Sequence, residues 1–224
     1  MTDSRVTPQS DYDARVHYNA ALIGGFMGTA TVFGLAGGFG NGWTGNAVSA
    51  ITNAFLGNTA IWTSRVIGAL LYMSAIAYIT WAKKHTPNVN MKYLSLVAIS
   101  VASVVLAFIP QNLPAPVGLY PTFISMSFLW CAFPGAYGFS CACIFNTNNM
   151  RQFTIGLAEV FLNGDESHRL RFKFYGLTLL FFHLGVVLMC VLQTVLKLGK
   201  YAVLAAIPLC ALMYININTK PKQA

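Results

Sequence analysis

Long apolar stretches alternate with short polar ones along the whole chain. About 20 apolar residues span the core of a bilayer, and six stretches reach or approach that length. We predict membrane spans at about 19–40, 61–82, 93–109, 119–140, 172–196 and 199–218. Two shorter runs with helical periodicity, near 46–57 and 149–162, lie between them. The pattern predicts an all-α, polytopic membrane protein with six transmembrane helices.

Two polar interruptions, at 41–46 (NGWTGN) and 145–150 (FNTNNM), come directly before or at the start of the short helices. At membrane depth, a broken helix must turn its open backbone groups toward protein or a water-filled cavity. Paired breaks in corresponding halves of a membrane protein favour a binding site. The short helices are amphipathic, so they either re-enter the bilayer or lie flat on it.

The two halves of the chain resemble each other in sequence. Thr44-Gly45-Asn46 precedes Thr147-Asn148-Asn149 by 103 positions, and Arg65 precedes Arg171 by 106. A three-residue insertion in the second short helix reconciles these offsets, although a chance match of short motifs is the alternative. Three spans per half is an odd number, so the second half must lie upside down relative to the first. The predicted parts are a polar, loosely ordered tail (1–18), two inverted three-helix repeats (19–110 and 119–218) and a C-terminal tail (219–224).

Composition and charge agree with a membrane protein. The chain is 56% hydrophobic and only 9% charged, whereas about a quarter of the residues of a soluble domain are charged. The net charge of +8 does not indicate nucleic-acid binding, because the 14 Lys and Arg are scattered between apolar segments. With the N-terminus inside, eleven of them lie on the cytoplasmic side and three outside. This distribution favours cytoplasmic N- and C-termini in the inner or plasma membrane.

Six polar side chains form the predicted solute site: Thr44, Asn46, Arg65, Thr147, Asn149 and His183. The first backbone NH groups of the short helices carry partial positive charge, which favours an anion or a carbonyl oxygen. Arg65 is the lone charge in a neutral region, where it would neutralise a substrate anion. His183 is the His expected well inside a span, where ionisable groups are commonly functional.

Each of these residues also has a purely structural interpretation. Asn and Thr cap helices, an arginine at a span end extends to lipid headgroups, and a neutral His bonds to a helix carbonyl. The interpretation as an arginine that extends to headgroups applies best to Arg171. Glu159 has no acidic counterpart in the first half, which argues against a symmetric coupling site. Glycines at 24, 28, 34, 38 and 42 favour close helix packing, within the monomer first and in a homodimer second.

The sequence contains no paired carboxylates, nucleophile elbow, phosphate loop or haem-ligation pattern. We therefore expect neither an enzyme nor a cofactor or metal centre. The first function hypothesis is a carrier that binds a small anionic or polar solute where the breaks meet and moves it by rocking one half against the other. The second is a non-catalytic structural or assembly subunit of a larger membrane complex. The expected partners are the lipid bilayer, the solute, and a second copy or complex subunits, but no nucleic acid.

A Gly-rich first span ending in Gly37-Gly38-Phe39, followed by Thr44-Gly45-Asn46 and a weaker copy before the fifth span, resembles the bacterial YoaK family. That family, also described as domain of unknown function 1275, lacks an agreed activity, so the resemblance over most of residues 20–215 implies a fold more than a function. Members usually carry an acidic residue in the first span where this chain has Gly28, and a second Thr-Gly where it has Thr147-Asn148. If the acid couples transport, its loss favours the subunit hypothesis.

Overall fold

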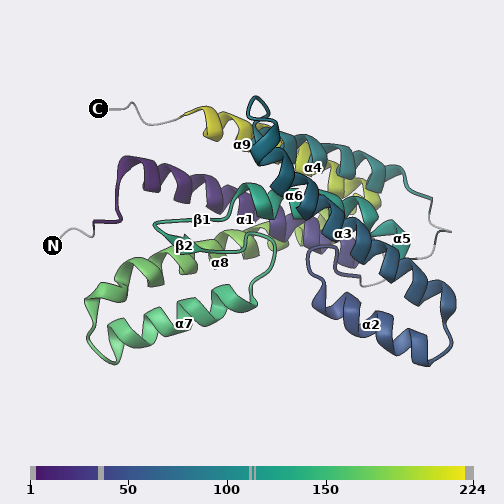
Figure 1. Cartoon of the computed structure of the whole chain (residues 1–224), viewed down its shortest axis with the longest axis horizontal. Helices are drawn as coiled ribbons and strands as arrows, with labels where there is room; N and C mark the ends of the chain where they lie inside the picture. Colours follow the sequence, from purple (N-terminus) through teal and green to yellow (C-terminus); the bar gives the residue numbers. More distant parts are fainter. Residues whose placement is uncertain (1–3, 35–37, 111–112, 114, 220–224) are drawn as a thin grey trace.

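A computed structural model of the chain shows a bundle of long helices from which two helical hairpins project (Figure 1). The structure describes residues 4–34, 38–110, 113 and 115–219. Within these residues, four helical stretches are long and apolar enough to cross a membrane: Thr59–His85, Met91–Phe108, Glu166–Val195 and Gly199–Asn218. The protein is therefore all-helical in its main elements and membrane-embedded.

Most predicted spans appear as helices with slightly shifted ends. The second, third, fifth and sixth correspond to α3 (Thr59–His85), α4 (Met91–Phe108), α8 (Arg169–Cys190) with a π-helical extension (Val191–Val195), and α9 (Ala206–Asn218) preceded by a 3₁₀ segment (Gly199–Ala205). These stretches are apolar over almost their whole length, so hydropathy locates them well.

Helix α1 (Pro8–Gly34) differs from the prediction at both ends. It begins inside the segment 1–18 that we expected to be a loosely ordered tail, because Tyr12 and Val16 are buried against other helices. It ends at Gly34, and residues 38–40 are not helical, so the predicted span 19–40 is wrong at its C-terminal end. Gly37 of the family-like motif lies outside the described residues.

The predicted fourth span, 119–140, is only partly helical. After the short α5 (Ala115–Gly118), α6 runs over Tyr120–Ala132 and stops. Pro134 lacks a backbone NH and disfavours a helical residue before it, and Gly135 follows with a positive φ of 138°. The chain then forms an antiparallel hairpin of β1 (Gly135–Ala136) and β2 (Phe139–Ser140). The prediction of a span through residue 140 is wrong, because hydropathy does not detect this turn.

The two predicted short helices are confirmed as α2 (Thr44–Phe55) and α7 (Thr147–Phe161). Helix α2 folds back on α3, and α7 folds back on α8 after the 3₁₀ turn Glu166–His168. They contain 12 and 15 residues, which matches the three-residue difference between the halves. In Figure 1 both helices begin near the middle of the molecule and run outward toward opposite ends.

Helices α1 and α8 form the closest helix contact of the bundle. A Cβ atom built at Gly25 would lie 2.0 Å from the carbonyl oxygen of Phe182, and one at Gly185 would lie 2.0 Å from that of Leu22. Real Cβ contacts are longer than 3.0 Å, so only glycine allows this approach. The predicted close packing therefore exists within the monomer, although it uses Gly25 and Gly185 rather than the glycines named from the sequence.

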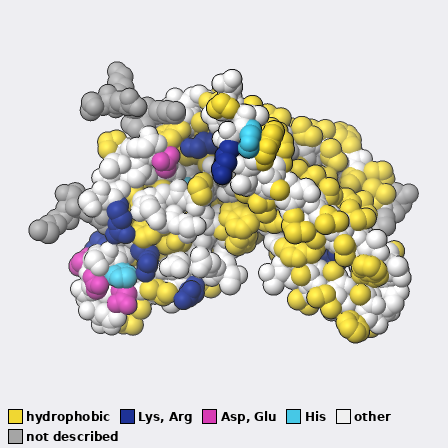
Figure 2. Space-filling model, viewed as in Figure 1, with side chains coloured by type: hydrophobic (Ala, Val, Ile, Leu, Met, Phe, Trp, Pro, Cys, Tyr) yellow, Lys and Arg dark blue, Asp and Glu magenta, His cyan; other side chains and the backbone are white. Residues whose placement is uncertain are grey.

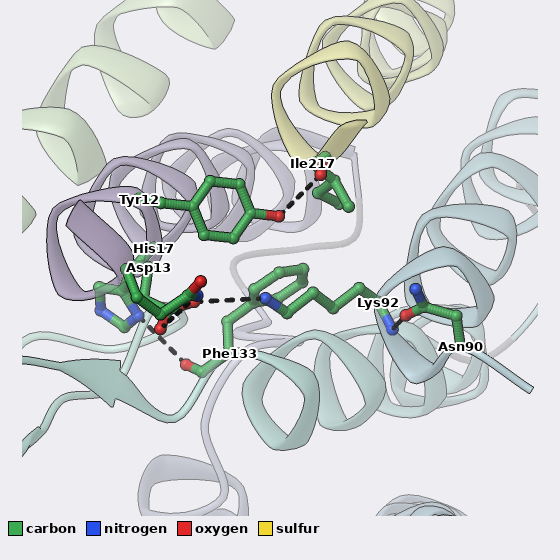
Figure 3. A network of polar contacts seen from close by, with 8 residues as sticks. Tyr12, Asp13, His17, Asn90, Lys92, Phe133 and Ile217 are labelled. Carbon is green, nitrogen blue, oxygen red and sulfur yellow. Dashed lines mark hydrogen bonds and ion pairs between the residues drawn. The ribbon is translucent and has the colours of Figure 1, made fainter. Parts of the chain in front are cut away.

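Both ends of the described chain lie at one end of the molecule, where polar contacts join α1, α4, α6 and α9 (Figure 3). The Tyr12 hydroxyl donates to the Ile217 carbonyl oxygen at 2.7 Å. The Lys92 ammonium lies 3.6 Å from an oxygen of Asp13 and 5.7 Å from the ring centre of Phe133. Figure 2 shows charged side chains gathered toward this end and hydrophobic side chains over most of the opposite end.

Candidate functional site

The two non-helical connections cover residues 38–43 (the first break) and 141–146 (the second break), so they begin three and four residues before the predicted interruptions, whose last residues are helical. The two breaks meet at Gly24 of α1. The side-chain NH₂ of Asn41 donates to the Gly24 carbonyl oxygen at 2.6 Å. From the second break, the carbonyl oxygen of Cys143 lies 2.1 Å from a Cβ atom built at Gly24. Gly24 is ten residues before the end of α1 at Gly34, or about 15 Å along the helix axis. The first break therefore returns from the end of α1 to its middle.

Asn46 and Asn149 close the two breaks in the same way. Each is the third residue of its short helix and is buried. The Asn46 amide donates to the carbonyl oxygens seven and four residues before it, at 2.8 and 2.7 Å. The Asn149 amide donates to the carbonyl oxygens at the same two spacings, at 2.6 and 3.3 Å. Both side chains thus satisfy break carbonyls that have no partner within a helix.

Arg65 brings a positive charge to the start of α2. From α3, its guanidinium donates to the side-chain oxygen of Asn46. Its Nε atom is buried and has no hydrogen-bond partner among the described residues. The chain has no Asp or Glu between residues 14 and 158, so α2 and α3 carry no carboxylate to neutralise it. The start of α2, which lacks a side-chain cap at Trp43, adds partial positive charge of its own.

The other predicted site residues, Thr44, Thr147 and His183, are exposed. Thr44 and Thr147 are the first residues of α2 and α7, both exposed and without a side-chain hydrogen bond among the described residues. His183 is exposed on α8, and its Nδ1 lies 2.7 Å from the carbonyl oxygen of Leu179 one turn earlier. The structure therefore brings Asn46 and Arg65 together, gives Asn149 the equivalent place in the second break, and separates His183 from these contacts.

Two buried polar residues beside the first break, Thr31 and Thr122, are not apparent from the sequence pattern. The Thr31 hydroxyl accepts from the Gly40 NH at 3.2 Å and donates to the Gly28 carbonyl oxygen at 2.8 Å. Thr122 of α6 contacts the same turn, since a Cβ atom built at Gly40 would lie 2.5 Å from its methyl group. Asn41 was recognisable as part of a polar break, but the two threonines lie in apolar stretches and carry no distinguishing motif.

Gly28 has a direct structural role. A Cβ atom built there would lie 2.3 Å from the side-chain nitrogen of Asn41. The Asn41 amide therefore occupies the space that an acidic side chain at position 28 would need. The absence of an acid at position 28 therefore goes together with the inward-pointing Asn41 side chain, which fills that space.

Two further observations concern the surroundings of the site. In the described part of the chain, no three His, Cys, Asp or Glu side chains gather as a metal site. A groove of about 570 Å³ lies between the start of α1 and the β1–β2 hairpin, which directly precedes the second break, with Thr7, Asp13 and Tyr137 in its lining.

The comparison with known families covers nearly the whole molecule. A family model described as "Protein of unknown function (DUF1275)" matches residues 16–215. This range contains both breaks and every site residue named above. No curated protein and no solved structure gives a significant match. By this match, the chain belongs to the DUF1275 family, as its glycine-rich first helix and Thr-Gly-Asn motif predicted.

Proposed function

We propose that this DUF1275 protein is a carrier for a small anionic solute that binds where the two breaks meet. The observation that carries the proposal is their convergence on Gly24, in the middle of α1. Interrupted helices at membrane depth are tolerated where they are buried in protein or line a cavity. In secondary carriers, such interruptions from two related halves form the substrate site.

The charge around the first break favours an anion over a neutral or cationic solute. Arg65 and the start of α2 are both positive, and no carboxylate follows residue 13 in the first half of the chain. A carboxylate or similar group would accept hydrogen bonds from the unpartnered Nε of Arg65 and from the first NH groups of α2. Asn46 would orient the guanidinium through the bond that it already accepts.

We further infer six spans arranged as two inverted three-helix repeats. In this arrangement α1 corresponds to α6, α3 to α8 and α4 to α9. The contact of α1 with α8 then has its counterpart in the contact of α6 with α3, and that of α4 with α6 has its counterpart in the contact of α9 with α1. All four contacts are present. The matching amide bonds of Asn46 and Asn149 support the same relation. So do the opposite directions of α2 and α7 in Figure 1. Two similar halves would allow a rocking motion about a shared site.

The remaining two spans in this arrangement are α1 and the pair α5–α6. Helix α1 has 27 residues, enough for about 40 Å. Residues 115–132, which include α5 and α6, extend about 27 Å if helical throughout, close to the roughly 30 Å of a bilayer core. Both termini would then lie on the cytoplasmic side, together with most Lys and Arg.

A carrier accounts for the polar groups better than an enzyme does. His183 bonds to the Leu179 carbonyl, and Glu159 accepts a hydrogen bond from Asn163 at 2.7 Å. Among the described residues, no hydrogen bond joins His183 or Glu159 to the other or to a break threonine. An acid–base pair at the breaks would require different contacts.

The test is a small-anion screen on the purified full chain. Acetate, lactate, nitrate and phosphate would be compared for their effect on the unfolding temperature in detergent, and an anion that stabilises would be followed in proteoliposome uptake. We expect stabilisation and uptake in the wild type and in Arg171→Gln, because Arg171 lies over the Phe139 ring rather than at a break. Both are expected to be lost in Arg65→Gln and Asn46→Leu. Undiminished uptake in those two variants would refute the site.

A subunit role is the second candidate, supported by the tight α1–α8 contact and by the surface of α2. Helix α2 exposes Val48, Ile51 and Phe55, the last of them 90% exposed, and it carries no charged residue. Such a surface suits lipid or another apolar chain. The mass of the particle purified in gentle detergent at native expression separates the hypotheses. Stoichiometric foreign subunits would favour assembly, and a particle of this chain alone would favour the carrier.

A further inference from the structure

Two side-chain oxygen atoms beside the C-terminal half of α1 are buried without a partner in the described part of the chain. They are Oδ1 of Asn41 and the hydroxyl of Thr122. Asn41 is 5% exposed and Thr122 is fully buried. Polar atoms in this state are uncommon in native proteins and commonly mark a bound water or ion. Because both atoms are oxygens, each has lone pairs to offer a ligand.

The two residues belong to one neighbourhood built from three elements. Gly40 precedes Asn41 in the first break and contacts Thr122 of α6 and Thr31 of α1. Thr31 is buried, and its hydroxyl already accepts from the Gly40 NH and donates to the Gly28 carbonyl. A ligand here would therefore meet neutral oxygens from α1, the first break and α6.

The local charge favours a cation. Thr31 lies in the last turn of α1, where carbonyl groups carry partial negative charge, and this turn contains no Lys or Arg. The absence of Asp and Glu between residues 14 and 158 argues against Ca²⁺ or Mg²⁺, which are usually bound through carboxylates. None of Thr31, Asn41 and Thr122 titrates near neutral pH, so a proton is not the ligand. A small monovalent metal cation fits the partial negative charge of the helix end, the absence of carboxylates and the absence of a titrating side chain.

We propose that Asn41, Thr122 and Thr31 form a binding site for a small monovalent metal cation such as Na⁺. The ligands would be the side-chain oxygens, supported by carbonyl groups at the end of α1. Ends of interrupted helices and unwound carbonyls supply such sites in carriers. The expectation of no metal centre rested on His, Cys, Asp and Glu patterns, which a set of neutral oxygens does not produce.

The cation would lie beside the C-terminal half of α1, toward its negative end, and the anionic solute at the positive start of α2, with the first break between them. Opposite charges held close in a medium of low dielectric attract, so each ligand would raise the affinity for the other. This coupling role rests on the proposed carrier function. Binding of the cation alone does not, because the site exists without the solute.

Equilibrium binding of radioactive ²²Na⁺ to the purified full chain, with choline chloride keeping the ionic strength constant, tests the site. We expect one Na⁺ per chain in the wild type and an affinity about tenfold or more weaker in Thr122→Val, which loses one oxygen at nearly constant volume. Thr178→Val is the matched control, because Thr178 is equally buried but bonds to the Phe174 carbonyl on α8. Asn41→Ala provides a second variant, and size-exclusion profiles verify that each protein is folded.

Each result bears on a separate proposal. Saturable Na⁺ binding that is retained in Thr178→Val and weakened in Thr122→Val supports the site. A wild type that binds no Na⁺ would show that the unpaired oxygens hold only water, and equal affinity in Thr122→Val would place the cation elsewhere; either result overturns the inference. Anion uptake without Na⁺ binding would leave the carrier and remove the cation site. Na⁺ binding without uptake of any anion would leave the site and remove the carrier.

Discussion

Replacing Gly185 by alanine is expected to force α1 and α8 apart. The added Cβ atom would lie 2.0 Å from the Leu22 carbonyl oxygen and 2.8 Å from the backbone nitrogen of Phe26. Both are backbone atoms of α1, so no side-chain rotation relieves the contact. Since Cβ contacts under 3.0 Å essentially never occur, the helices must separate locally by about 1 Å or more.

The loss in free energy of unfolding follows from the core packing that this separation disturbs. Overpacking a well-packed core typically costs about 1–3 kcal/mol. We expect the upper end of that range here, because Phe26 and Met189 beside the contact are fully buried and would lose packing as well. For a chain of this size, a loss of about 3 kcal/mol lowers the unfolding temperature by roughly 6–12 °C. Gly25→Ala is expected to act similarly, and the double variant to cost less than the sum, because one displacement relieves both contacts.

The assay is stepwise heating of the detergent-solubilised chain, followed by measurement of the remaining monodisperse fraction by size-exclusion chromatography. All variants would be heated at one rate, because unfolding of such proteins is commonly irreversible. Gly34→Ala is the matched control on the same helix, since its added Cβ atom meets nothing within 4 Å. A Gly185→Ala protein within about 2 °C of the wild type would refute the reasoning, as would equal damage from Gly34→Ala.

Three other predictions use different features. Asn149→Ala is expected to cost about 1–3 kcal/mol, because it leaves the buried Ala142 carbonyl unpaired, whereas exposed Thr147→Ala is expected to leave the unfolding temperature unchanged; equal losses in a thermal melt would contradict this difference. His183→Gln is expected to retain solute uptake in proteoliposomes, and abolished uptake would place His183 on the transport pathway. A reporter that fluoresces only in the cytoplasm is expected to be bright when fused to the C-terminus, and a dark fusion would argue against the proposed orientation.

The elements predicted well are those with local signals. Helices α2 and α7 follow polar breaks and have an amphipathic period, so their position and type were apparent from short windows of sequence. The hairpin after α6 also had a local signal, because Pro134-Gly135 is a turn dipeptide. The apolar residues on both sides of it outweighed that signal in a hydropathy-based prediction.

The features predicted poorly depend on distant contacts. The helical start of α1 is stabilised by burial of Tyr12, whose hydroxyl bonds to Ile217 at the other end of the chain. The pairing of Asn46 with Arg65 required the fold-back of α2 on α3. Thr122 lies against Gly40, the neighbour of Asn41, only because α6 packs beside the first break. Asn46 and Arg65 belonged to one predicted site, but no pattern along the chain contains these contacts themselves.

The dominance of the α1–α8 contact has a consequence for biosynthesis. Residue 169, where α8 begins, follows residue 34, where α1 ends, by 135 positions. At 5–20 residues per second, the ribosome needs about 7–27 s to make that stretch. Within the described chain, α1 is also not among the helices apolar enough to be recognised as spans on their own. Among the described helices, α1 therefore waits longest for its main partner. In the proposed six-span arrangement, insertion machinery or neighbouring helices must retain it until α8 has been synthesised.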